Sequence, residues 1–385
     1  MRIAITHPTT WPEVRRGTER FVNELADWLG RRGHEVTVLS SHSGPGERTD
    51  HGPYATELVR RLLPISPTAH AIALYPFILP CLVRLLRDRY DVVHCCSFAD
   101  ALAASLARSR NGTPYVFYVN GVPPTAPRYR LRPTLRLYHR AIRDADEVVV
   151  ISRYAAESMG AERRGVMIAP PVDTRQFRPD PQARAPQPTI LCTAALDDPR
   201  KGAQLLVRAF DRLKTRRPDA ALVLAGPGAA PVREALLAAL PVRWHGDVEF
   251  RDAGQLHELP DLYRRAWVTV LPSLREPFGM VVLESLASGT PVVGARSGAL
   301  PEILTDTAIG MLFEPGTDLD QPTNVDGLVQ ALDQGLTLAA RSETSERCRR
   351  AAEPFSWERL GPEFERLYER LVGAPRDGLE HRQAS

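Results

Sequence analysis

The chain alternates short apolar runs with amphipathic stretches, in two successive series separated by a proline-rich segment. The first series has strand-like runs at 3–5, 36–39, 91–94, 115–118 and 147–151, and the second at 189–192, 221–225, 268–271 and 292–293. Between the first two runs, apolar positions at Phe21, Val22, Leu25, Trp28 and Leu29 follow the helical period, and Thr18 is placed to cap that helix. This alternation predicts an α/β protein with parallel, doubly wound sheets.

A chain of 385 residues is too long for one ordinary domain and suits two of middling size. We expect an N-terminal Rossmann-like domain over 1–178, a proline-rich linker over 179–188 and a second Rossmann-like domain over 189–355. Residues 356–373 are expected to form a helix, and the polar residues 374–385 a disordered tail. Two such domains predict a cleft between them, because ligands of doubly wound sheets bind beyond the carboxyl ends of the strands.

Composition narrows the class of partner. The net charge is +3 with 25% charged residues, so the chain lacks the basic footprint of a nucleic-acid-binding protein. Only Lys201 and Lys214 are lysines among 49 basic residues, and in this arginine-rich background each retained lysine is informative. Five cysteines, odd in number and without metal-type spacing, indicate buried, reduced thiols and a cytoplasmic location.

No membrane anchor is expected. The N-terminus begins with a strand-like run and shows no secretory signal. The most apolar stretch, 71–86, contains Pro76, Pro80 and Arg84 and falls short of a membrane span. A core helix is the favoured interpretation, while contact with a lipid surface stays open.

The most informative segment is SLREPFGMVVLESLASGTPVV, residues 273–293. It predicts a helix over 280–287, ended by Gly289 and followed by a buried strand. Backbone N–H groups of Phe278, Gly279 and Met280 at the helix start can hold phosphate, which the helix dipole favours. Glu276 before the helix and Glu284 within it lie on either side of that phosphate. A site of this kind suits a sugar joined through diphosphate to a ribose.

The pattern E-x7-E, with Pro277-Phe278-Gly279 after the first Glu and S-G-T-P-V after the second, resembles the donor site of retaining family 4 glycosyltransferases. The resemblance implies the GT-B fold, two Rossmann-like domains facing each other across a cleft, with the C-terminal helix crossing back to the first domain. It also implies sugar transfer from a nucleotide-diphosphate sugar without a metal or other cofactor. Glu276 would then hold the sugar hydroxyls and Glu284 the ribose.

A second motif, 196–202, lies between a strand and a helix and matches the family's K-G pair. Lys201 would neutralise the charge that builds on the departing diphosphate, so the resemblance makes Lys201 and Glu276 the catalytic residues. The family usually has an arginine a few residues earlier, where this chain has Ala194 and Ala195. Arg200 is a candidate substitute.

Other matches extend the site. The loop with Arg16, Gly17 and Thr18 faces donor phosphates and acceptor in the family, although Arg16 replaces a glycine, and a plain turn is an equal alternative. Family histidines that contact the sugar or acceptor correspond to Cys96 and to Asn120 before Gly121, whereas His94 is expected in the core. An asparagine-glycine pair is replaced by Pro170-Pro171. Gly226 and Arg251 match positions that receive the nucleotide base.

Two patterns favour structural interpretations. Asp144-Ala145-Asp146 imitates a metal-binding pair but lacks a third ligand nearby, so no metal is expected. The arginines between Arg128 and Arg143 are expected to form a solvated helix face, with anionic lipid or a phosphorylated acceptor as the alternative.

We therefore expect a retaining glycosyltransferase that moves a sugar from a nucleotide-diphosphate donor to a small soluble metabolite or glycan. One alternative is a nucleotide-sugar-binding protein with impaired catalysis, suggested by Ala195, Cys96 and Asn120. Another is an enzyme that acts on lipid or polysaccharide at a membrane surface. A related GT-B-like enzyme such as a nucleotide-sugar epimerase is disfavoured by the E-x7-E and K-G strings.

Overall fold

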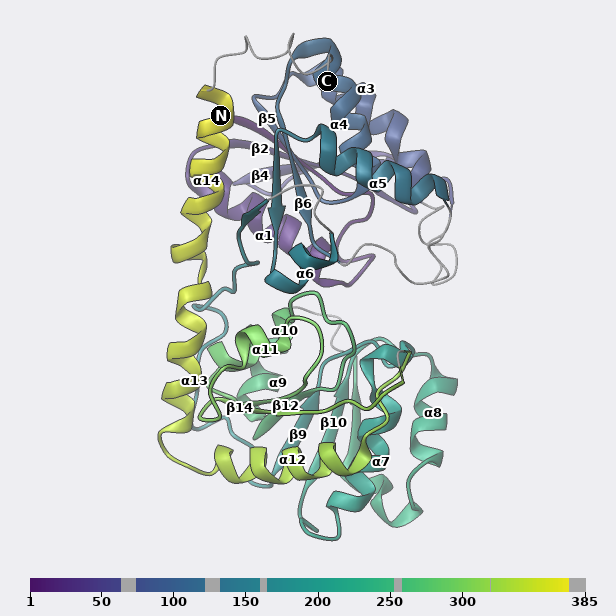
Figure 1. Cartoon of the computed structure of the whole chain (residues 1–385), viewed down its shortest axis with the longest axis vertical. Helices are drawn as coiled ribbons and strands as arrows, with labels where there is room; N and C mark the ends of the chain where they lie inside the picture. Colours follow the sequence, from purple (N-terminus) through teal and green to yellow (C-terminus); the bar gives the residue numbers. More distant parts are fainter. Residues whose placement is uncertain (64–73, 122–131, 160–164, 253–257, 319, 374–385) are drawn as a thin grey trace. The chain divides into compact units, whose positions relative to one another are not determined.

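The computed structural model describes residues 1–385 except 64–73, 122–131, 160–164, 253–257, 319 and 374–385. It divides the chain into two compact units (Figure 1). Unit 1 comprises Met1–Pro170 together with the chain from Leu360 on, and unit 2 comprises Pro171–Arg359. The expected tail, 374–385, lies outside the described residues. In the part of the chain described, no helix is long and apolar enough to cross a bilayer.

Unit 1 contains an eight-stranded sheet in the order β3-β4-β2-β1-β5-β6-β7-β8, in which only β3 and β4 pair antiparallel. Its strands are β1 (Arg2–Thr6), β2 (Glu35–His42), β3 (Glu47–Asp50), β4 (Tyr54–Arg60), β5 (Val92–Cys95), β6 (Tyr115–Val119), β7 (Glu147–Val150) and β8 (Val166–Met167). Its helices are α1 (Gly17–Arg31), the short η1 (Tyr75–Phe77), α3 (Ile78–Asp88), α4 (Phe98–Asn111), α5 (Arg132–Asp144) and α6 (Arg153–Ser158), joined by most of α14 (Trp357–Gly373).

The two faces of this sheet are covered by different helices, because side chains alternate along each strand. Val93 and Cys95 of β5 join the apolar cluster formed with α3, α4 and α5. His94 between them points to the opposite face, where its ring lies 6.1 Å from that of Phe21 on α1 and 6.0 Å from that of Phe364 on α14. The C-terminal helix is thus packed into the core of unit 1.

Unit 2 contains a six-stranded, all-parallel sheet in the order β11-β10-β9-β12-β13-β14. Its strands are β9 (Thr189–Cys192), β10 (Ala221–Ala225), β11 (Val248–Arg251), β12 (Val268–Leu271), β13 (Val292–Ala295) and β14 (Gly310–Phe313). Its helices are η4 (Pro199–Lys201), α7 (Ala203–Leu213), α8 (Ala230–Ala238), η5 (Val242–Asp247), α9 (Leu259–Arg265), α10 (Met280–Ala287), α11 (Leu300–Ile303), α12 (Val325–Ala339), α13 (Thr344–Ala352) and η6 (Glu353–Phe355).

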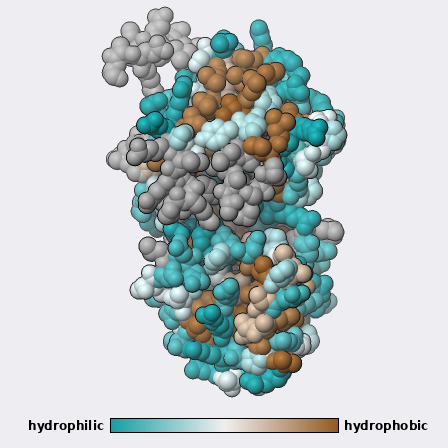
Figure 2. Space-filling model, turned by 90° about the vertical axis from the view of Figure 1, so that its right-hand side faces the viewer, coloured by the Kyte–Doolittle hydropathy of each residue, from teal (hydrophilic) through white to brown (hydrophobic). Residues whose placement is uncertain are grey.

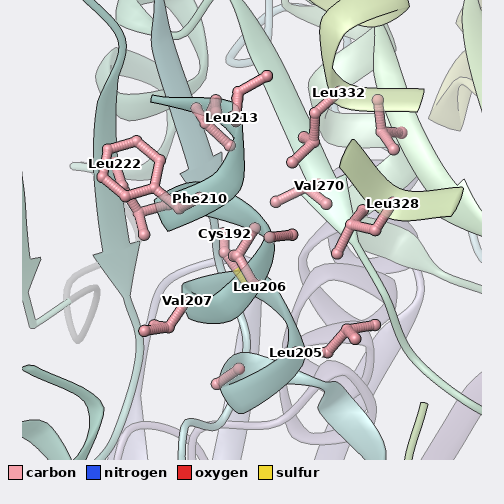
Figure 3. Close-up of a cluster of buried hydrophobic side chains, with 14 of the residues drawn as sticks. Cys192, Leu205, Leu206, Val207, Phe210, Leu213, Leu222, Val270, Leu328 and Leu332 are labelled. Carbon is pink, nitrogen blue, oxygen red and sulfur yellow. The ribbon is translucent and has the colours of Figure 1, made fainter. Parts of the chain in front are cut away.

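The core of unit 2 lies between this sheet and helices α7 and α12. Figure 3 shows Phe210 of α7 beside Leu222 of β10 and Leu206 of α7 beside Cys192 of β9, in one buried cluster with Val270 of β12 and Leu328 of α12. The other face of β12 carries Thr269, whose hydroxyl accepts a hydrogen bond from Ser285 of α10 at 2.7 Å. Helix α10, which carries Glu284 of the E-x7-E motif, is therefore held against the sheet face opposite α7.

The division into units falls earlier than the boundary after residue 178 expected from the sequence. Val172 donates from its backbone to Phe355 O at 2.8 Å, which ties the chain to unit 2 from this point. The proline-rich segment 179–188 also lies within unit 2, where Ala185 O accepts a hydrogen bond from Trp267 Nε1 at 2.8 Å. The composition of this segment therefore predicts irregular structure but not a free linker.

Candidate donor site and acceptor-side edge

The strand order of each sheet marks where a ligand should bind. A doubly wound sheet reverses its order at one point, and a crevice opens there beyond the carboxyl ends of the two strands. In unit 2 the reversal lies between β9 and β12, which are neighbours in the sheet. The loop after β9 carries Lys201 and the loop after β12 carries Glu276. Topology alone thus brings the two predicted catalytic residues to the same edge of the sheet.

Lys201 and Glu276 are in direct contact. The Lys201 Nζ lies 2.7 Å from Glu276 Oε2, and the two side chains are 27% and 13% exposed. Two backbone contacts fix the loops: Leu274 N donates to Arg200 O at 2.8 Å, and Ala299 N donates to Glu276 O at 2.9 Å. The ion pair is partly open to solvent, so an incoming anion could reach the ammonium.

Two helices begin at this edge with glycine at the N-cap. Gly202 before α7 and Gly279 before α10 have φ values of 73° and 98°, in the left-handed region that glycine tolerates best. Neither N-cap supplies a side-chain acceptor, so the first N–H groups of each helix are left for another partner. A Cβ on Gly202 would meet Pro272 O at 2.9 Å, which shows how closely the two loops approach. Such helix starts favour a bound phosphate.

Glu284 lies in the first turns of α10 but is buried, with 2% exposure. Its Oε2 accepts a hydrogen bond from the Tyr263 hydroxyl at 2.7 Å, and that hydroxyl lies 3.0 Å from Thr193 Oγ1. The sequence indicated Glu284 but neither Tyr263 nor Thr193. A tyrosine on a short helix carries no motif of its own, and its contact with Glu284 arises only when α9 packs beside α10.

The remaining donor-side residues have more varied surroundings. The Arg200 guanidinium donates two hydrogen bonds to the carboxylate of Asp198, from Nε at 3.2 Å and from Nη2 at 2.6 Å. Burial opposes ionisation of Asp198, yet the bonds from Arg200 outweigh it and hold the pKa of that carboxyl below its ordinary value. Arg200, the candidate substitute for the missing family arginine, is thus already engaged. Arg251 is half-exposed and paired with Glu249.

Gly226 and Phe278 contribute through packing. A Cβ on Gly226 would lie 2.0 Å from Ala194 O, so only glycine permits this approach of the loops after β9 and β10. Phe278 is buried with its ring 6.1 Å from that of Phe355. Pro277 and Met280, which lie near Phe278 in the E-x7-E motif, are partly exposed.

In unit 1 the sheet order reverses between β1 and β5, and the residues expected on the acceptor side lie at the carboxyl ends of β1, β5 and β6. Arg16, not Thr18, is the N-cap of α1, because the helix begins at Gly17 and Thr18 lies within its first turn. No side chain caps this helix start. Asn120 Nδ2 donates to Cys96 O at 2.8 Å, which joins the ends of β6 and β5. Gly121 follows, and no atom of the described residues lies within 4 Å of a Cβ placed on it.

Cys96 does not present its thiol to solvent. The residue is 2% exposed, and burial raises the pKa of its thiol well above the ordinary value. His94 is buried as expected, its Nδ1 lies 2.7 Å from the Tyr368 hydroxyl, and burial lowers its pKa to about 3. Cys96 stands where the family has a histidine that contacts the sugar or the acceptor, but its side chain is buried here.

Two buried carboxylates at this edge were missed in the sequence. Asp100 accepts hydrogen bonds at Oδ2 from Thr6 Oγ1 and Cys96 N, both at 2.8 Å, and Glu19 accepts one from Thr9 at 2.6 Å. Burial is the main cause that raises the pKa of Asp100 to about 6. A signal existed for Asp100, because Ser97-x-x-Asp100 has the spacing of a capping box.

Asp144 and Asp146 are held by arginines. Arg140 and Arg143 bind Asp144 at 3.0 Å and 3.2 Å, and Arg108 binds Asp146 at 2.6 Å. Within the described ranges, no group of three or more His, Cys, Asp or Glu residues could hold a metal ion.

Comparison with known proteins identifies the family of the chain. The family model for Glycosyltransferase Family 4 matches residues 15–176, and the model for Glycosyl transferases group 1 matches residues 187–336. A D-inositol 3-phosphate glycosyltransferase from Actinosynnema mirum is 27% identical over 359 residues, which cover 81% of this chain and 84% of that protein.

A second relative, the GDP-mannose-dependent alpha-(1-6)-phosphatidylinositol monomannoside mannosyltransferase of Mycolicibacterium smegmatis, is 35% identical over 223 residues. The match covers 52% of this chain and 57% of the relative, so the chain spans little more than half the length of that protein.

Solved structures show the same fold. Sucrose-phosphate synthase from Thermosynechococcus elongatus has a TM-score of 0.84 at 20% identity, covering 97% of this chain and 100% of the other. Anabaena HepE in complex with UDP and glucose has a TM-score of 0.71 at 17% identity, covering 96% and 99%. The two α/β units have the GT-B fold, and with the two family models covering most of its length, the chain belongs to the family 4 glycosyltransferases.

Proposed function

We propose that the protein is a retaining glycosyltransferase that moves a sugar from a nucleotide-diphosphate donor to a hydroxyl of an acceptor. The observation that carries the proposal is the 2.7 Å contact of Lys201 with Glu276 at the starts of two helices that no side chain caps. An ammonium and two helix N-termini are suited to a diphosphate, and they stabilise it most when it departs with its full charge.

The roles follow from the surroundings of each side chain. Lys201 and the N–H groups at the start of α10 stabilise the leaving diphosphate. Glu276, when its partner ammonium turns to phosphate, is left with acceptor oxygens for the sugar hydroxyls. Glu284, oriented by Tyr263, is the candidate for the ribose hydroxyls. No metal or other cofactor takes part in the proposed reaction.

The acceptor is proposed to be a small hydroxylated metabolite or a glycan. Two relatives are named for inositol-containing compounds, one for D-inositol 3-phosphate and one for a phosphatidylinositol monomannoside, and these are the first acceptors to try. A cytoplasmic location belongs to the proposal, and five free, buried cysteines are compatible with a reducing compartment.

The test is release of nucleoside diphosphate from GDP-mannose or a UDP-sugar in the presence of EDTA, with each acceptor added in turn. We expect release that is slow without acceptor and much faster with it, and a product whose anomeric configuration, read by NMR, matches that of the donor. Inversion would overturn the retaining assignment, and a requirement for added metal would overturn the metal-independent one.

A second candidate is a nucleotide-sugar-binding protein without catalysis. The specific observation in its favour is the engagement of Arg200 by Asp198, which leaves the missing family arginine without a ready substitute. Slow hydrolysis of donor in the absence of acceptor separates the two, because an enzyme shows it and a pure binding protein does not.

A further inference from the structure

Helices α3, α4 and α5 form one layer over the sheet of unit 1, and the outer surface of this layer is unusual. We call it the α3–α5 surface and define it by its exposed side chains, which are Leu79, Val83 and Arg87 of α3, Leu106 and Arg110 of α4, and Leu135, Arg136 and Arg140 of α5. Two hydrogen bonds tie the layer together, from Asn111 Nδ2 to Leu85 O at 3.4 Å and between Tyr75 and Thr134 at 2.8 Å.

Helix α3 is apolar on both sides. Cys81 and Leu85 are buried in the core of unit 1, as expected for the core helix that the sequence predicts here. On the opposite side, Leu79 and Val83 lie one turn apart and are 68% and 48% exposed. Figure 2 shows apolar atoms gathered on the side of unit 1 that α3, α4 and α5 form. An exposed apolar area of this kind is typical of a surface that binds another protein or a membrane.

The same layer concentrates positive charge. Its three helices contain eight arginines against three aspartates, whereas the net charge of the whole chain is only +3. The helices themselves thus have a larger net positive charge than the whole chain, although Glu57 of β4 pairs with Arg84 and Arg87, and Asp146 pairs with Arg108. Asp100 is buried, and the other two aspartates already bind arginines, Asp88 through Arg87 and Asp144 through Arg140 and Arg143. Within the described residues, Arg110 and Arg136 have no carboxylate within ion-pair distance.

We propose that the α3–α5 surface docks the protein on a membrane that contains anionic lipid, with Leu79 and Val83 entering the interface and the arginines binding lipid phosphates. Aliphatic side chains on one helix face beside arginines are the pattern of segments that lie in the plane of a bilayer surface. Each arginine near an anionic surface strengthens binding by about fivefold. An acidic protein would match the charges, but it would also need an apolar patch opposite Leu79 and Val83, whereas an anionic bilayer supplies both phosphates and an apolar interior.

The proposal goes beyond the transferase activity, because it holds for a soluble or a lipid acceptor. It also joins the two segments for which the sequence left lipid contact open, 71–86 and 128–143, in one surface. Leu79 and Val83 of α3 are two of its four exposed aliphatic residues.

The test is co-sedimentation of the full chain with sucrose-loaded vesicles, either pure phosphatidylcholine or phosphatidylcholine with phosphatidylglycerol. The variants are Leu79→Asp with Val83→Asp, and Arg110→Gln with Arg136→Gln. Val242→Asp is the matched control, because Val242 is 80% exposed but lies in unit 2. Thermal melting verifies that each variant is folded, which exposed positions should permit.

We expect sedimentation with the anionic vesicles only, reduced by added salt. Each double variant should lower the partition coefficient about tenfold or more, while Val242→Asp leaves it unchanged. Absence of binding to anionic vesicles overturns the proposal, and so does equal loss in the control. Binding to polyglutamate as strong as to vesicles, and unaffected by the Leu79 and Val83 changes, would reassign the surface to an acidic macromolecule. None of these outcomes depends on sugar transfer.

Discussion

The two lysines of the chain lie in opposite surroundings. Lys201 is partly exposed at the edge of the sheet beside Glu276. Lys214 is buried, donates to Ala220 O at 3.0 Å and Pro218 O, and pairs with Asp247 at 2.9 Å. Its ammonium also lies 4.7 Å from the Trp244 ring. The scarcity of lysine indicated that both are special, but only the structure separates a candidate for catalysis from a residue that holds the fold.

This contrast gives a paired prediction. Lys201→Ala should lower kcat by about 10²–10³-fold with little change in melting temperature, because it removes a charge that acts on the leaving group. Lys214→Ala should lower the free energy of unfolding by about 2 kcal/mol, since two carbonyls lose a charged donor, with kcat of the folded enzyme unchanged. Steady-state kinetics and thermal denaturation of both variants check this. A normal kcat for Lys201→Ala would remove the residue from the mechanism.

Burial of Glu284 changes how its role must be tested. Glu284→Ala would leave the buried Tyr263 hydroxyl without one of its partners, so any loss of nucleotide binding would be confounded with a loss of stability. Glu284→Gln keeps an oxygen for Tyr263 and removes the charge. We expect it to weaken nucleotide binding by about tenfold while the melting temperature stays near that of the wild type. Isothermal titration with nucleoside diphosphate measures the first quantity, and unchanged affinity would separate Glu284 from the ribose.

A site residue could be predicted from the sequence where a motif determines the position of its side chain. Glu276 and Lys201 lie on loops whose ends are set by strands in the same sheet, so their meeting could be predicted. Cys96 could not be placed correctly, because a side chain at a strand end faces either side of the sheet and a one-residue difference reverses it. The Tyr263–Glu284 contact depends on packing between two helices, which spacing does not show.

The helices and strands that could be predicted are those with a buried face, because burial gives their sequences an apolar pattern. The expected helix over 280–287 is α10, and the runs 189–192, 221–225 and 268–271 are β9, β10 and β12. The strand β3 was missed, because its sequence, ERTD, is exposed throughout and has no apolar alternation. It is an antiparallel edge strand whose formation depends on pairing with β4.

Strand β5 and helix α4 carry two buried groups with opposite pH effects. His94 has a pKa lowered to about 3, so its contribution to stability is present above about pH 6.5 and is lost as the pH falls. Asp100 has a pKa raised to about 6, so its contribution is present below about pH 4 and is lost as the pH rises. Between about pH 4 and pH 6 the two effects oppose each other.

Asp100→Asn should therefore expose the effect of His94. Asparagine keeps an oxygen for Thr6 and for the Cys96 amide but does not titrate. On acidification from pH 6.5 to pH 4, the variant should lose about 2 kcal/mol more of its free energy of unfolding than the wild type. Urea denaturation at several pH values measures this difference, with Asp144→Asn as a partly exposed control. Parallel pH profiles for Asp100→Asn and wild type would contradict the assignment.

Each unit of the molecule has its own sheet and its own core, but the chain crosses between them twice. The residues expected to bind the nucleotide lie mostly in unit 2, between Lys201 and Glu284, whereas α14 from Leu360 on belongs to unit 1. Its apolar positions could be read from the sequence, and the family resemblance implied its return to the first domain, which is confirmed; the residues it packs against could not be predicted. They lie more than 240 positions earlier and include Phe21 and Tyr118.

This organisation predicts that stability of unit 1 and nucleotide binding can be separated. Phe364 is fully buried, with its ring 5.8 Å from that of Phe21 and 6.0 Å from that of Tyr118. Phe364→Ala should destabilise unit 1 by about 3–5 kcal/mol through the cavity it leaves. Affinity for nucleoside diphosphate should stay unchanged, because the donor-binding loops and helices belong to unit 2.

Leu206→Ala is the matched change in the core of unit 2, where Leu206 is also fully buried. Calorimetric melting should assign the two variants to different transitions, and added nucleotide should raise only the transition that Leu206→Ala lowers. If Phe364→Ala instead weakened nucleotide binding as strongly as it lowered stability, the nucleotide would have to depend on unit 1. The assignment of its binding energy to Lys201, Glu276 and the start of α10 would then be incomplete.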